Sequence, residues 1–139
     1  MKNYEFIEHT ADIGVRAYGK NLEELFENAA QAIFSLITDN TASGDKERQI
    51  KLEGQTLEDL LVNWLNELIS VFFTYKFLPK SYNITILKQN PNILEASAKG
   101  IEYDPYSQKI DTEIKAATYH NLKIERDSKG YKAEIIFDV

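Results

Sequence analysis

The sequence contains no cysteine, and only three prolines and two histidines occur among its 139 residues. Without cysteine the protein has no disulfide, no thiolate-bound zinc, no iron–sulfur cluster and no thiol nucleophile. A long hydrophobic run is also missing, because the longest apolar stretch, near residues 68–73, is too short and interrupted to span a bilayer. No secretory signal is visible, so we expect a cytoplasmic protein with no membrane association.

Basic residues are in the minority, with 16 Lys and Arg against 22 Asp and Glu and a formal net charge of -6. No cluster of Lys and Arg stands out that could neutralise a row of phosphates, so we expect little direct binding to nucleic acid. The sequence also lacks HExxH-like spacing, a Gly-rich phosphate loop and a GxSxG turn, which are signatures of hydrolases and nucleotide-binding proteins.

Two segments, residues 22–37 and 57–73, repeat apolar side chains at steps of three and four residues. This period predicts two amphipathic helices, each with one face for the core. Asn21 and Thr56 precede the two runs and are good N-caps, whereas Pro79 is expected to stop the second helix. We interpret Trp64 and the aromatic residues of these faces as core residues.

Most of the remaining chain is typical of strands. Apolar and polar residues alternate in the segments 13–17, 82–86 and 110–116, and turn signals occur at residues 90–92, 104–105 and 128–130. The stretch 39–45 is the one loop of any length. We therefore predict a single α+β domain spanning residues 1–139, with two amphipathic helices packed on a largely antiparallel β-sheet.

Four polar residues lie in otherwise apolar surroundings: His9, Asp12, Lys115 and Asp138. Asp138 places a carboxylate next to the terminal oxygens of Val139, and oxygen donors suit hard cations such as calcium or magnesium. If the last strand lies beside the strand opened by Asp12, a third carboxylate joins them and a cation is needed to keep the group charged. A solvated, frayed terminus explains Asp138 equally well from spacing alone.

The other candidates have structural alternatives too. Asp12 is explained by an Asx-type turn before the strand, and His9 by an ordinary hydrogen-bonded role. Lys115 alternates with Asp111 and Glu113, which favours a solvated or cross-strand lysine; the functional alternative is contact with an acidic partner or a phosphate.

Four motifs together resemble the archease family over essentially the whole chain. They are the segments 9–14 (HTADIG), 60–69 (LLVNWLNELI), 113–120 (EIKAATYH) and 136–139 (IFDV). The resemblance implies a non-enzymatic accessory protein of the RtcB-type GTP-dependent RNA ligase, which promotes guanylylation and repeated turnover of the ligase in tRNA splicing or RNA repair. It also implies a chaperone-like effect on a tRNA cytosine methyltransferase as a second role.

The resemblance also implies a divalent-metal site. The family's ligands fall on Asp12, Asp138 and an oxygen of Val139, with calcium as the expected ion and magnesium or manganese as alternatives. Lys115 falls on a position needed for partner activation, and Asp39 matches an acidic family position that a helix-end cap also explains. Two further alternatives stay open: a metal-dependent hydrolase using His9, Asp12 and Asp138, and a simple folding chaperone.

Overall fold

The structure is a computed structural model that describes residues 2–9 and 12–139. Its elements in chain order are β1 (Tyr4–His9), β2 (Asp12–Gly19), α1 (Leu22–Ile37), β3 (Lys46–Gly54), α2 (Leu57–Tyr75), β4 (Phe77–Lys88), β5 (Asn92–Glu102), β6 (Ala116–Ala117), β7 (Ile124–Asp127) and β8 (Gly130–Asp138). All strand pairs are antiparallel, in a five-stranded sheet of order β1-β2-β8-β6, with β7 also paired to β8, and a three-stranded sheet of order β3-β5-β4.

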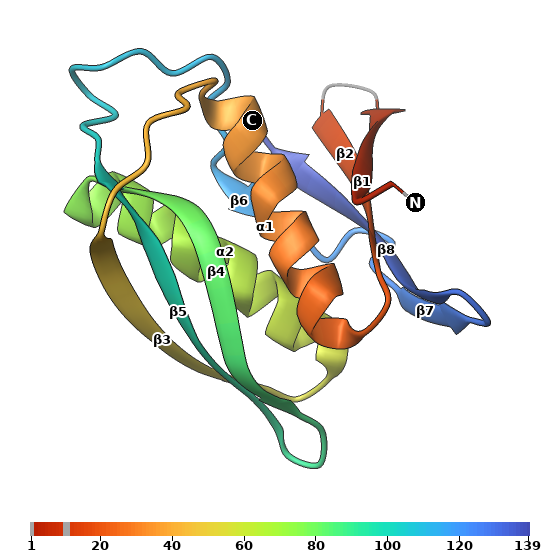
Figure 1. Cartoon of the computed structure of the whole chain (residues 1–139). Coiled ribbons are helices and arrows are strands. Elements are labelled where there is room, and N and C mark those ends of the chain that lie inside the picture. The colour runs from red at the N-terminus through yellow and green to blue at the C-terminus, as the bar shows by residue number, and fades with distance from the viewer. Residues whose placement is uncertain (1, 10–11) are drawn as a thin grey trace.

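The two helices lie between the two sheets (Figure 1). Helix α1 packs on β1, β2 and β8 on one side and on β4 on the other, while α2 packs on β3, β4 and β5 and also contacts β6. The largest fully buried side chains include Trp64, Phe26, Phe72 and Phe137. The predicted α+β fold with two amphipathic helices on antiparallel strands is confirmed, but the strands divide into two sheets where we expected one.

Both helices begin where the sequence predicted. The Asn21 side chain accepts a hydrogen bond from the Glu24 N–H at 2.8 Å, and Thr56 accepts one from the Asp59 N–H at 3.0 Å. The prediction that Pro79 stops the second helix is wrong. Helix α2 ends at Tyr75, and Lys76 adopts the left-handed conformation with φ of 56°, which ends a helix before any proline is needed. No helix in the described part of the chain is both long and apolar enough to cross a membrane.

The strand predicted over residues 110–116 is also wrong, because only Ala116 and Ala117 pair with a neighbour. Burial does alternate there, with Ile114 fully buried and Lys115 exposed. The Asp111 N–H, however, donates to the carbonyl of Ile37 at the end of α1 at 2.7 Å. Alternating burial thus came from an irregular segment packed on the core, which makes hydrogen bonds to β8 only from Lys115 onwards.

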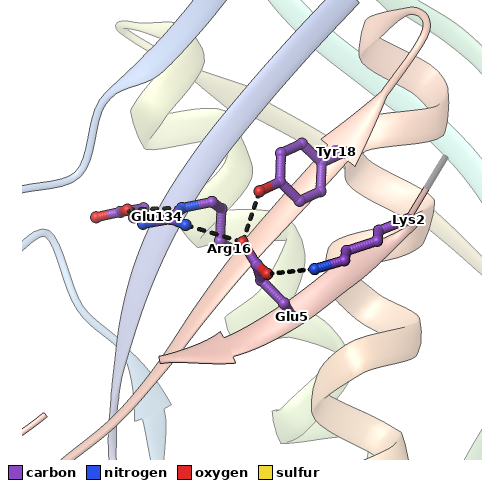
Figure 2. A network of polar contacts seen from close by, with 5 residues as sticks. All are labelled: Lys2, Glu5, Arg16, Tyr18 and Glu134. Atoms are coloured by element: carbon purple, nitrogen blue, oxygen red, sulfur yellow. Dashed lines mark hydrogen bonds and ion pairs between the residues drawn. The ribbon is translucent and has the colours of Figure 1, made fainter. Parts of the chain in front are cut away.

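The face of the five-stranded sheet that points away from the helices carries a polar network centred on Arg16 (Figure 2). Arg16 lies directly opposite Glu5 on β1 and Glu134 on β8. Its guanidinium donates to Glu5 at 2.8 Å and, through Nε, to Glu134 at 2.8 Å. The Tyr18 hydroxyl and the Lys2 ammonium also donate to Glu5, at 2.7 and 3.0 Å. The network therefore ties together the three strands that begin and end the chain.

The Glu5 carboxylate should make stability depend on pH. Hydrogen bonds from Tyr18, then Lys2 and Arg16, lower the pKa of Glu5 from 4.5 to about 2. A lowered pKa in the folded state stabilises the fold above the unfolded pKa, and this contribution disappears as pH falls from about 4.5 towards 2. We expect Glu5→Gln to be less stable than the wild type at pH 7 and equal to it near pH 2, measured by urea unfolding. A stability difference that is constant over this range would contradict the prediction.

Trp64 should be the most sensitive link between the two helices. Its side chain is fully buried, and Nε1 donates to the Phe26 carbonyl of α1 at 2.9 Å. Replacement by Phe removes this bond and leaves unfilled volume, which should lower the free energy of unfolding by about 1–3 kcal/mol. Tyr75→Phe is the control on the same helix, because Tyr75 is exposed and surface changes usually cost less than about 0.5 kcal/mol. Equal unfolding midpoints for the two variants would contradict this assignment.

Candidate functional site

The pairing of β2 with β8 brings two candidate residues together. The last printed pair of the β2–β8 ladder is Ile13 with Phe137, and continuing this register by one residue places Asp12 opposite Asp138. Phe137 points into the core, so its neighbour Asp138 lies on the outer face, as does Asp12. β1 adds His9 opposite Asp12, and β6 adds Ala116 opposite Asp138. The expectation that the last strand lies beside the strand opened by Asp12 is confirmed, whereas the ligand roles stay predictions.

The donor chemistry of this row fits a divalent cation. Residues directly opposite each other in an antiparallel pair have Cβ atoms about 4.5–5.5 Å apart, and two carboxylates at that spacing repel each other unless another group balances their charge. Asp138 is exposed, and Asp12 is partly exposed and also interacts with another group of the chain. Within residues 2–9 and 12–139, no three His, Cys, Asp or Glu residues form a metal-binding group. Two neighbouring carboxylates alone do not complete a metal site, so the ligand set of Asp12, Asp138 and an oxygen of Val139 stays a prediction.

Lys115 is held at the same edge of the sheet. Its backbone N–H donates to the Asp138 carbonyl at 2.9 Å, and its side chain is exposed. On the next residues, the N–H and hydroxyl of Thr118 both donate to the Ile136 carbonyl, each at 2.9 Å. The backbone of Lys115 is therefore held beside Asp138. The prediction that Lys115 lies on the polar face of a long strand is wrong, because β6 contains only Ala116 and Ala117.

The two remaining candidates from the sequence are Asp39 and His9. Asp39 does not cap α1, because Thr38 is the C-cap and Asp39 follows it on the surface. Asp39 lies near Lys109, whose pKa is raised by a hydrogen bond and charge from Asp111 and, to a smaller extent, by the charge of Asp39. His9 ends β1, and its side chain lies outside the described parts of the structure, as do residues 10 and 11 and the turn proposed there.

Sequence reasoning missed one side chain at this edge. Asn66 of α2 hydrogen-bonds to both backbone groups of Ala117: it accepts from the N–H at 2.7 Å and donates to the carbonyl at 3.3 Å. The signal available in the sequence was a carboxamide residue directly after Trp64 and Leu65 in the apolar pattern of the second helix.

None of the hollows whose linings are described includes the carboxylate row. A broad hollow of about 700 Å³ does open on the five-stranded sheet, but it lies towards the far end of β2, beside Tyr18, Gly19 and Tyr131. Its described lining includes neither Asp12, Lys115 nor Asp138. The hollow and the carboxylate row are therefore two separate features of the sheet.

Comparison with known proteins gives relatives over the full length of the chain. A protein archease of Methanosarcina mazei is 40% identical over 141 residues, covering 99% of this chain and 97% of the relative. A protein archease of Sulfurisphaera tokodaii is 41% identical over 140 residues, with 100% of both chains covered.

Two solved structures share the fold. The solution structure of protein 1598 of Methanobacterium thermoautotrophicum matches with a TM-score of 0.84 and 33% identity over 100% of both chains. The crystal structure of a Thermotoga maritima archease, described as a possible chaperone, matches with a TM-score of 0.70 and 30% identity, covering 96% of this chain and 94% of that one.

The motif resemblance noted in the sequence is confirmed on a larger scale. Residues 4–139 match the model of the Archease protein family (MTH1598/TM1083). With relatives at about 40% identity over the same length, this chain belongs to the Archease family.

Proposed function

We propose that this protein is a non-enzymatic accessory factor of an RtcB-type GTP-dependent RNA ligase and promotes guanylylation and repeated turnover of that enzyme. The observation that carries the proposal is the strand-end row, where Asp12 and Asp138 are adjacent in register and the Lys115 backbone bonds to Asp138. An anionic pair and a cation on one open edge can contact the active site of another enzyme. The description of an archease relative as a possible chaperone supports a partner protein more generally.

Asp12, Asp138 and an oxygen of Val139 would hold the divalent ion, and calcium matches their hard oxygen chemistry. When bound, such an ion supplies positive charge that can neutralise phosphate oxygens of a nucleotide held by the partner. The chain's own contribution is geometric. The β2–β8 register fixes the spacing of the two carboxylates, and the exposed Asp138 is accessible to a partner.

The overall charge favours action on an enzyme over action on RNA. With a net charge of -6, the protein is repelled by a polyanion and attracted to the basic surface of an RNA-binding enzyme. Complementary charge of this kind accelerates encounter and is weakened by salt. Stimulation of the ligase should therefore decline as ionic strength rises.

The decisive experiment measures ligation with limiting ligase and a large excess of RNA. The accessory role predicts many turnovers per ligase with this protein and few without it, and no turnover of nucleotide or RNA by this protein alone. Hydrolysis of a phosphoester by the isolated protein would favour the metal-dependent hydrolase. Suppression of partner aggregation that survives loss of Asp12 and Asp138, without any effect on turnover, would favour a simple chaperone.

Asp12→Asn and Asp138→Asn should each weaken calcium binding by about tenfold or more, because each change removes a charged oxygen from the site while preserving side-chain shape. Ligase stimulation should fall with it, and calorimetry and the turnover assay measure the two effects. Asp45→Asn is the matched control, since Asp45 is exposed and precedes β3 of the other sheet. Unchanged calcium affinity in either variant would remove that residue from the proposed site.

Lys115→Ala should reduce ligase stimulation by about tenfold through lost contact with the partner, and leave calcium affinity nearly unchanged. An ammonium group is a donor only, and it does not coordinate a cation. Lys123→Ala is the control, because Lys123 is also exposed but lies just before β7. A large loss of calcium affinity would instead show that Lys115 organises the carboxylates.

A further inference from the structure

The segment that carries Lys115 has very little regular structure of its own. β6 consists of only Ala116 and Ala117, at the edge of the five-stranded sheet. Strands of globular proteins usually have 3–10 residues, and short edge segments open easily. Hydrogen bonds to β8 fix one side of the segment, through the N–H groups of Lys115 and Thr118. The question is what fixes its other side.

The other side is fixed by the carboxamide of Asn66. One amide group supplies an acceptor to the Ala117 N–H and a donor to the Ala117 carbonyl, at 2.7 and 3.3 Å. A neighbouring strand would satisfy the same two backbone groups in the same way. Ala117 is also nearly fully buried, so an N–H left without Asn66 would have poor access to water.

We propose that Asn66 is a positioning residue for partner activation: it stands in for a strand and holds residues 115–118 against β8, so that Lys115 meets the partner from a fixed place. This inference rests on the proposed role of Lys115. Asn66 directly follows Trp64 and Leu65, which are buried in the core, so it connects the core helix α2 to the edge proposed for partner binding.

The test compares Asn66→Ala with Asn63→Ala. Asn63 is the matched control because it lies one turn earlier on α2 and also donates to a backbone carbonyl, that of Glu53 on β3, at 2.9 Å. Amide hydrogen exchange needs no ligase, and the Lys115, Ala117 and Thr118 amides should exchange about tenfold faster in Asn66→Ala, the effect of losing roughly one net hydrogen bond. In Asn63→Ala these amides should exchange at the wild-type rate.

A double-mutant cycle of Asn66→Ala with Lys115→Ala, measured by ligase stimulation, distinguishes a positioning role of Asn66 from a role in stability alone. If Asn66 acts through Lys115, Asn66→Ala lowers stimulation, and the double variant is no worse than Lys115→Ala alone. Asn63→Ala should leave stimulation unchanged. Asn66→Asp keeps the acceptor for the Ala117 N–H but loses the donor, so it should restore part of the stimulation. If Asn66→Ala does not fold, the Asp variant is measured in its place, with intermediate exchange rates expected.

Three outcomes would overturn the inference. Wild-type exchange at residues 115–118 in Asn66→Ala would show that β8 alone holds the segment. Normal stimulation by Asn66→Ala, when Lys115→Ala is defective, would refute the positioning role and leave the proposed function intact. Normal stimulation by Lys115→Ala would refute the role of Lys115 and this inference together, while a wild-type protein without any effect on the ligase would refute the proposed function itself.

Discussion

The antiparallel pairing of β2 with β8 is the constraint on which the rest of the molecule depends. It joins the first and last parts of the chain, since the Arg16–Glu134 contact spans 118 residues of sequence. On the inner face, Val15, Ala17, Ile135 and Phe137 are all fully buried against the helices. On the outer face, the same register determines which charged residues become neighbours. A shift of one residue would exchange the two faces, so the core specifies the site.

The outer face carries two polar rows that differ in charge balance. In the Arg16 row, a cation lies between Glu5 and Glu134, and Lys2 adds a second cation beside Glu5, so the charges of this network balance. In the row of Asp12 and Asp138, two carboxylates are neighbours. Between them lies an apolar row in which Gly14 faces Ile7 and Ile136, and a Cβ on Gly14 would come within 3.2 Å of Ile7. Four residues of strand separate Arg16 from Asp12 by roughly 13 Å, beyond effective screening lengths at physiological salt.

Periodicity in the sequence predicted the two helices correctly, but it did not predict the features that depend on pairing between distant strands. The amphipathic pattern and the caps Asn21 and Thr56 located both helices, because these signals are local. The division into two sheets depends on which strands meet across the helices, and no local pattern carries that information. Alternation at residues 110–116 was misleading because a packed irregular segment and a strand bury the same residues. Asp12 and Asp138 were identifiable as candidates, but only the register could make them neighbours. Asn66 lies within the motif of residues 60–69, but nothing in that motif indicates its contact with residue 117.

The site's construction is consistent with action on another protein. Asp12 and Asp138 lie at strand ends on the outer face of the five-stranded sheet, where a second molecule can contact charged side chains. The fold holds these groups rigidly. β8 and α2 hold the Lys115 segment from two sides, and the Arg16 network ties β1 and β2 to β8. Groups held rigidly before binding lose little conformational entropy when a partner arrives. Under the proposed role, a small acidic protein of this construction would bring a few rigidly held charged groups to the active site of a larger enzyme.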